Sequence, residues 1–161
     1  MIINTRAYGQ IKVDDKQRIH FPYGIFGFEE YKYYVLVDSS EGLPFYWLQS
    51  EKTVDIAFLI VNPRLFINDY KLEIPQEDKK TINIETDHDI LDFITITIVD
   101  DISNITGNLQ GPIIINKKNH KAIQSISLNS QYSTKYYLMG KNQTPDSNIF
   151  AARGKENVST V

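Results

Sequence analysis

The segment from residue 19 to residue 28, Ile-His-Phe-Pro-Tyr-Gly-Ile-Phe-Gly-Phe, constrains the fold more than any other part of the chain. It is apolar and aromatic, but Pro22, Gly24 and Gly27 interrupt it, and this composition prevents continuation as either a strand or a helix. We therefore expect a strand that ends near Phe21 and then a tight irregular loop. The large apolar side chains of that loop are Tyr23, Ile25, Phe26 and Phe28. Such a loop either plugs the end of a β core or displays apolar side chains to a partner.

The clearest strand in the sequence covers residues 93–99, Phe-Ile-Thr-Ile-Thr-Ile-Val. Its isoleucines and threonines alternate, and β-branched side chains with a period of two are typical of a strand with one buried face. Residues 56–61 form an unbroken apolar run, which is the pattern of a strand buried on both faces. The Asn62-Pro63 pair ends that run, because proline lacks a backbone donor and restricts the residue before it.

Short β-rich runs separated by turn residues occupy much of the remaining chain. We expect these strands at residues 2–3, 10–13, 18–21, 34–37, 45–49, 112–116 and 122–128. Single helical turns are expected at residues 29–33 and 64–70, and Pro75 followed by acidic residues is the best helix start. The sequence therefore predicts a mainly β fold, a small antiparallel β-barrel or sandwich with one or two short helical turns.

Composition indicates one globular domain, which we expect to cover residues 1–138. Hydrophobic residues make up 42% of the 161-residue chain. Residues 139–161 are polar, and we expect a flexible C-terminal tail there. The chain has no cysteine, no apolar run of membrane-spanning length and no signal-peptide pattern at its start. These features together favour a cytoplasmic protein with no role at a membrane.

Charge is segregated along the sequence. From Glu73 to Asp101 there are nine acidic residues against Lys79 and Lys80, a net charge of −7. From residue 102 to residue 145 there are five lysines and no acidic residue. If the acidic segment forms one surface, it attracts a basic protein and repels nucleic acid. The alternative is that these charges only solvate outward faces and turns.

The sequence does not indicate a catalytic, cofactor or metal site. Its three histidines have no metal-ligand spacing, and there is no Gly-rich phosphate loop or Gly-x-Ser-x-Gly motif. The run Asp87-His88-Asp89 is most simply a turn, but it leaves one alternative open. That alternative is a small ligand- or metal-binding β-barrel protein, or an enzyme, that uses these three side chains. Direct nucleic-acid binding is not expected from a chain with a net charge of −3. We therefore expect a non-enzymatic protein-binding module without a cofactor.

Several short motifs follow one another in a specific order. Residues 19–28 fit Ile-x-Phe-Pro-x-Gly-Ile-x-Gly-Phe, and residues 108–116 read Asn-Leu-Gln-Gly-Pro-Ile-Ile-Ile-Asn. Between and after them lie Leu48-Gln49-Ser50, Ala57-Phe58, Asn62-Pro63, Phe66, Tyr70, Gln124, Leu128 and Tyr132. This ordered set, over about residues 1–138, resembles the FliW family of flagellar assembly factors. Gly111 stands where the second of these motifs usually has alanine.

The resemblance implies a small β-barrel-like protein without enzymatic activity that acts in the cytoplasm. Members of this family bind flagellin and also bind CsrA, an RNA-binding translational repressor. Export of flagellin would free the FliW protein to capture CsrA and so relieve repression of flagellin translation.

Two groups of residues are the candidates for these contacts. For flagellin we expect exposed apolar groups in the loop at residues 21–28 and the turn at residues 62–70. These residues are Phe21, Pro22, Ile25, Phe28, Asn62, Phe66 and Tyr70. The alternative is that Phe28 or Phe66 simply belongs to the core. For CsrA we expect the acidic segment, with Glu77, Asp78 and Glu85.

Overall fold

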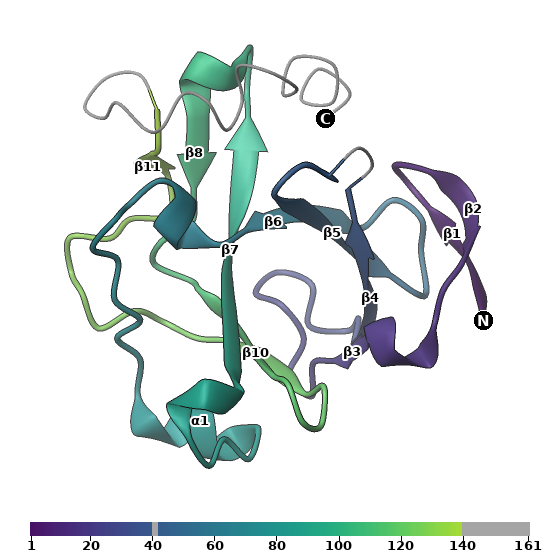
Figure 1. Cartoon of the computed structure of the whole chain (residues 1–161), viewed down its shortest axis with the longest axis horizontal. Helices are drawn as coiled ribbons and strands as arrows, with labels where there is room; N and C mark the ends of the chain where they lie inside the picture. Colours follow the sequence, from purple (N-terminus) through teal and green to yellow (C-terminus); the bar gives the residue numbers. More distant parts are fainter. Residues whose placement is uncertain (40–41, 140–161) are drawn as a thin grey trace.

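Antiparallel strands are the main secondary structure of the protein, a computed structural model that describes residues 1–39 and 42–139 (Figure 1). The strands are β1 (Ile2–Thr5), β2 (Gly9–Lys12), β3 (Arg18–His20), β4 (Tyr33–Asp38), β5 (Phe45–Ser50), β6 (Ala57–Val61), β7 (Ile90–Ile98), β8 (Ile105–Gly107), β9 (Ile113–Asn116), β10 (Ala122–Gln124) and β11 (Tyr136–Tyr137). Helix α1 covers Gln76–Thr81, and short 3₁₀ helices cover Asp15–Gln17, Pro63–Leu65, Asp87–Asp89 and Ile102–Asn104. The predicted C-terminal tail, apart from Met139, lies outside the described residues.

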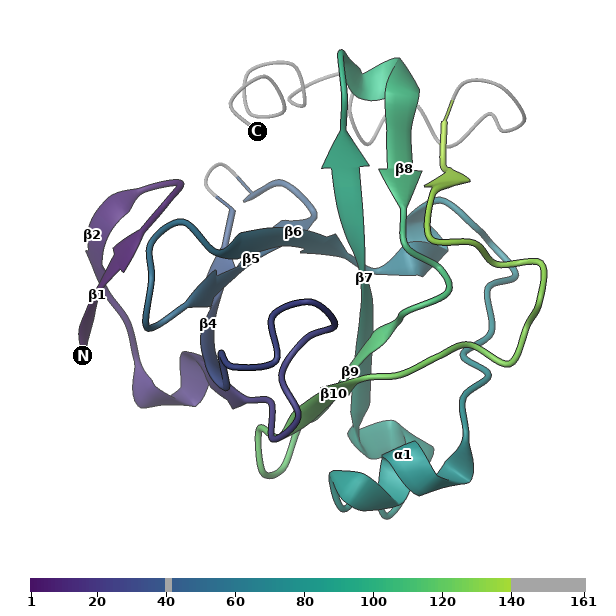
Figure 2. The same ribbon diagram turned by 180° about the vertical axis from the view of Figure 1, so that it is seen from behind.

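The main sheet is antiparallel and curls back on itself (Figure 2). Its strand order is β10-β9-β7-β6-β5-β4-β3, and β8 and β11 extend it from β7. A parallel bridge between His20 and Lys121 joins β3 to β10, and the His20 amide donates to the His120 carbonyl over 3.0 Å. These contacts bring the two ends of the sheet together as a barrel. The predicted antiparallel β architecture is therefore confirmed.

Strand β7 is the longest element, with nine residues, and it contacts three neighbouring strands in turn. Its first four residues, 90–93, pair with β9. Ile94 and Thr95 pair with β6, and residues 96–98 pair with β8. The alternating pattern at residues 93–99 predicted this strand, although the strand begins three residues earlier.

The strands β5, β6 and β7 separate two hydrophobic cores. In β6, Ile60 points into the core inside the barrel, whereas Leu59 and Val61 point into a second core on the opposite face. Phe93 and Ile94 of β7 divide in the same way. The unbroken apolar run at residues 56–61 predicted burial on both faces, and the two cores confirm that prediction.

Two local predictions are wrong, and two strands were missed. Residues 29–33 are not a helical turn, since Glu29 and Glu30 lie in a turn and Tyr33 begins β4. The strand predicted at residues 122–128 ends at Gln124, because Pro112, opposite Ser125, has no N–H with which to continue the ladder. Strands β8 and β11 were not predicted, since two or three residues are too few to show an alternating pattern.

Tyr34 supplies a test of the barrel core. Its side chain is fully buried, and its hydroxyl is the buried side-chain polar atom without a hydrogen-bond partner among the described residues. An unpartnered buried hydroxyl costs about 1–3 kcal/mol, so Tyr34→Phe should leave Tm at pH 7 unchanged or raise it. Burial raises the pKa of Tyr34 to about 12, above the value of about 10 in an unfolded chain. The stability that this shift provides is complete below pH 10 and is lost as the pH rises towards 12.

We therefore expect Tm of Tyr34→Phe to fall less than that of the wild type between pH 10 and 12. Thermal unfolding followed by circular dichroism at pH 7, 10 and 12 measures both effects. A Tm several degrees lower at pH 7 would contradict the assignment, because it would mean that the hydroxyl has a stabilising partner.

Candidate protein-binding surfaces

Residues 21–28, hereafter the plug loop, close one end of the barrel (Figure 2). Phe21 and Ile25 are buried in the barrel core, and short backbone hydrogen bonds hold the loop, from Phe21 to Lys32 and from Phe28 to Ile25, both 2.7 Å. Gly24 has φ +69°, and a Cβ there would lie 2.6 Å from the Cα of Glu29. The loop therefore needs glycine at this position.

The plug loop also presents apolar side chains to solvent. Tyr23 and Phe26 are 62% and 54% exposed, and Phe28, which packs edge-on against Phe58, is 36% exposed. Pro22 is half-buried. Of the predicted contact residues, Phe21 and Ile25 are not accessible, because they are the side chains that fill the barrel. The loop thus both plugs the core and displays a surface, which the sequence offered as alternatives.

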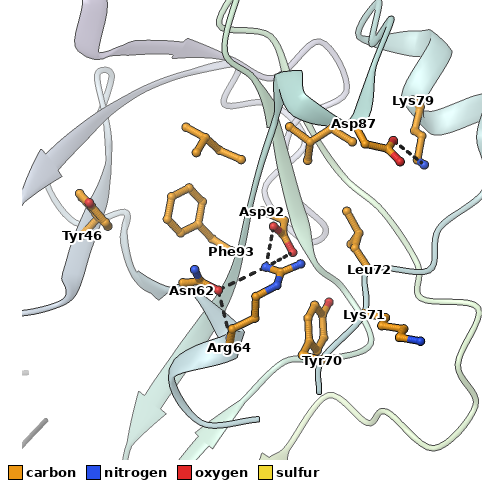
Figure 3. A pocket seen from close by; sticks show the side chains of 12 residues that line it. Tyr46, Asn62, Arg64, Tyr70, Lys71, Leu72, Lys79, Asp87, Asp92 and Phe93 are labelled. Carbon is orange, nitrogen blue, oxygen red and sulfur yellow. Dashed lines mark hydrogen bonds and ion pairs between the residues drawn. The ribbon is translucent and has the colours of Figure 1, made fainter. Parts of the chain in front are cut away.

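Residues 62–70 border a groove of about 640 Å³ that also includes Asp87, Asp92 and Lys79 (Figure 3). The Arg64 guanidinium donates to both Asp92 carboxylate oxygens, at 2.9 and 3.1 Å, and lies 5.2 Å from the centre of the Tyr70 ring. Asn62 is exposed, and its side-chain oxygen accepts from the Arg64 amide at 3.0 Å. The charges of Arg64 and Asp92 thus neutralise each other within the groove. The Asn62 side chain caps the 3₁₀ helix Pro63–Leu65.

The predicted exposure of Phe66 and Tyr70 is wrong. Phe66 is 6% exposed and belongs to the second core, where the turn at residues 62–70 covers β6 and β7. Tyr70 is also buried and stacks on Tyr132 with ring centres 5.5 Å apart. Burial, and then the nearby Asp92 carboxylate, raise the pKa of Tyr70. Both residues fill the interior because the 3₁₀ helix turns the chain back over the sheet.

The acidic segment does not form one surface. Glu77 and Glu85 are exposed on and after α1, at one end of β7, whereas Asp100 and Asp101 follow the opposite end of that strand (Figure 1). Asp78 accepts a short hydrogen bond from the Ser125 hydroxyl. Part of the predicted acidic surface is therefore found around α1, with Glu77 and Glu85, whereas Asp100 and Asp101 lie at the opposite end of β7.

The turn between β9 and β10, which contains Lys117, Lys118 and Lys121, packs against the acidic segment. The Lys117 amide donates to the Asp89 carbonyl at 2.8 Å, and the Lys118 ammonium lies 3.6 Å from the Asp89 carboxylate. The segregation of charge along the sequence is thus partly cancelled in space.

The run Asp87-His88-Asp89 forms a 3₁₀ helix in which Asp87 pairs with Lys79 at 3.3 Å. Asp89 is buried between Lys118 and the Thr86 hydroxyl. Within residues 1–39 and 42–139, no three His, Asp or Glu side chains gather in a way that could hold a metal ion. In this same part of the chain, no helix has the length and apolar character needed to cross a membrane.

Comparison with known proteins identifies the family. A sequence model of the FliW protein matches residues 2–138. The chain belongs to the FliW family. A flagellar assembly factor FliW of Treponema denticola is 42% identical over 141 residues, which are 88% of this chain and 95% of the relative. A relative with the same name from Thermoanaerobacter pseudethanolicus is 38% identical over 140 residues, which are 86% of this chain and 93% of the relative.

The fold agrees with this assignment. A crystal structure of a flagellar assembly factor FliW superposes on this FliW-family protein with a TM-score of 0.80 and 30% sequence identity. The match covers 88% of this chain and 99% of the other. The resemblance seen in the ordered motifs is therefore confirmed.

Sequence reasoning missed two exposed apolar residues, Ile126 and Leu128. Both were assigned to a strand at residues 122–128, in which apolar residues alternate with glutamine and serine. That pattern predicts one buried face, but strand β10 ends at Gln124, and beyond it these two side chains are exposed to solvent. The change of face has no signal in the sequence, because Ser125 and Ser127 suit a strand and a loop equally well.

Phe66→Ala tests the corrected position of that residue. Truncation of a phenylalanine in a core costs about 3–5 kcal/mol of unfolding free energy. Phe26→Ala is the matched control, and its exposed side chain should change the stability by no more than about 0.5 kcal/mol. Urea denaturation measures both values. Equal stability of the two variants would place Phe66 outside the core.

Proposed function

We propose that this FliW-family protein is a non-enzymatic flagellar assembly factor that binds flagellin in the cytoplasm and antagonises CsrA. The observation that carries the proposal is the pair of exposed aromatic side chains, Tyr23 and Phe26, on a loop that buried Phe21 and Ile25 anchor in the barrel. Exposed aromatic groups on a rigid scaffold are typical of protein-binding sites. The relatives named flagellar assembly factors support the biological role.

Flagellin fits the plug loop by its chemistry. The terminal regions of flagellin form amphipathic helices in the assembled filament, so the monomer has an apolar stripe that needs cover. Tyr23 and Phe26 offer an apolar surface of the kind that amphipathic helices occupy, and Phe28 with Pro22 adjoins them. The backbone of the loop is already ordered by its internal hydrogen bonds, which lowers the entropic cost of binding.

The flagellin proposal is tested with the double variant Tyr23→Ser, Phe26→Ser and purified monomeric flagellin. Loss of the two aromatic side chains that would contact flagellin should weaken binding by roughly tenfold or more. The Tm should be unchanged, because both side chains are exposed in the free protein. The matched control is Val99→Ser, because Val99 is exposed but lies beyond the far end of β7. Isothermal titration calorimetry gives the affinities. If the double variant binds flagellin as tightly as the wild type, the plug loop has no role in this contact. If the wild type does not bind flagellin, the proposed function is contradicted.

The proposed CsrA contact uses the exposed acids around α1. CsrA is basic where it grips RNA phosphates, and Glu77 and Glu85 are exposed carboxylates, opposite in charge to that part of CsrA. Exposed charges act mainly by speeding encounter, and physiological salt screens them with a Debye length of about 8 Å.

The variant Glu77→Lys, Glu85→Lys should therefore associate with CsrA several-fold more slowly than the wild type at low salt, and the difference should shrink as salt rises. Asp78 is left in place because it bonds Ser125. The control variant, Asp55→Lys with Asp100→Lys, makes the same change in net charge at exposed positions away from α1. Surface plasmon resonance at two salt concentrations gives the rates. Equal slowing by both variants would mean that overall charge, and not this region, steers association.

A further inference from the structure

Ile126 and Leu128 stand out in the chain that follows β10. They are 54% and 64% exposed, whereas Ser125 between them and the sheet is buried. Backbone hydrogen bonds fix the segment at three points, from Ser125 to Pro112 (2.9 Å), from Ser127 to Gln110 (2.8 Å) and from Leu128 to Glu73 (2.8 Å). In an extended chain alternate residues share a face, so the two apolar side chains point outward together.

Gln124 connects this segment to the plug loop. Its buried side-chain amide donates to the Gly111 carbonyl and accepts from the Phe26 amide, both at 3.0 Å. The Phe26 backbone is therefore fixed next to the start of the segment. Ile126 lies two residues beyond Gln124 and so faces the same side of the chain as the Gln124 side chain that holds Phe26. We therefore group Phe26, Ile126 and Leu128 as one surface from two parts of the chain, hereafter the apolar face.

Acidic residues border the apolar face on two sides. On the plug-loop side are Glu29, which accepts from the Gly27 amide at 3.0 Å, and Glu30; both are exposed. On the other side is exposed Glu73, whose carbonyl holds the Leu128 amide. Glu77 follows in the first turn of α1, and Asp78 is bonded to Ser125.

The lysines of α1 lie in its last turn, and one of them, Lys79, is already paired with Asp87. On the plug-loop side Lys32 lies near Glu29. Carboxylates still outnumber ammonium groups at both ends of this surface, and its centre is apolar.

We propose that the apolar face, with these acidic borders, docks an amphipathic helix whose apolar stripe is flanked by lysine or arginine side chains. The charge pattern selects this occupant, because an acid-flanked helix would bring like charges together at both borders. The inference rests on the proposed function, because Phe26 belongs both to the proposed flagellin contact and to the apolar face. It extends the site to Ile126 and Leu128, and it specifies the charge of the partner segment.

The probe is a synthetic amphipathic peptide of about 18 residues, roughly five helical turns, with a leucine stripe flanked by lysines. A second peptide keeps the leucines and replaces each lysine by glutamate. Fluorescence anisotropy of the labelled peptides should show the lysine peptide binding the wild type at least roughly tenfold more tightly, with an affinity that falls as salt rises. Ile126→Ser, Leu128→Ser should weaken that binding by roughly tenfold or more. The variant Glu73→Gln, Glu77→Gln should weaken binding of the lysine peptide less than Ile126→Ser, Leu128→Ser does, and it should reduce the salt dependence of that binding.

The control is Val99→Ser with Val54→Ser, which removes two exposed apolar side chains elsewhere and should leave peptide affinity unchanged. Equal affinity for the two peptides, equal losses in control and test variants, or no binding of the lysine peptide would overturn the inference.

Purified flagellin separates this inference from the proposed function. Wild-type binding of flagellin with no effect of Ile126→Ser, Leu128→Ser would refute the extended face alone, whereas peptide binding without flagellin binding would refute the proposed partner alone.

Discussion

Burial of apolar side chains on both faces of β6 and β7 is the constraint on which the rest of the structure depends. A sheet with one solvated face would need only one core, but here Ile60 and Leu59 point into different interiors. Each interior then needs its own cover. The plug loop supplies cover for the barrel, and the turn at residues 62–70 together with residues 132–139 supplies it for the second core. The positions of both loops follow from this requirement.

The plug loop shows how one short segment can serve stability and recognition together. Gly24 and Gly27 adopt positive φ values, which reverse the chain within a few residues. The two residues between these glycines point in opposite directions, so that Ile25 enters the core while Phe26 remains at the surface. Because the buried residues fix the backbone, the exposed aromatic groups do not need to be ordered when a partner arrives.

Much of the fold was predictable from the sequence, because period-two alternation at residues 93–99 and the apolar run at residues 56–61 are direct consequences of burial. The candidate surface was less predictable. Phe66 and Phe26 are the same residue type near similar turn signals, yet one is buried and the other exposed. That difference depends on the second core, which is built from residues distant in sequence. Likewise, the sequence separates acidic residues 73–101 from basic residues 102–145, but the fold brings Lys118 next to Asp89 and so partly cancels that separation.

The closure of the barrel at His20 also limits how the protein can associate through its backbone. An open sheet ends in rows of unpaired amide and carbonyl groups, which serve as templates for a strand of another chain. In the main sheet the end strands β3 and β10 have three residues each, and His20 bonds across to His120, while the outer strand β11 on the branch from β7 has only two residues. Each end of the sheet thus covers the other. Such a protein can recognise partners through side chains displayed by its loops while offering little of its main sheet for extension by a foreign strand.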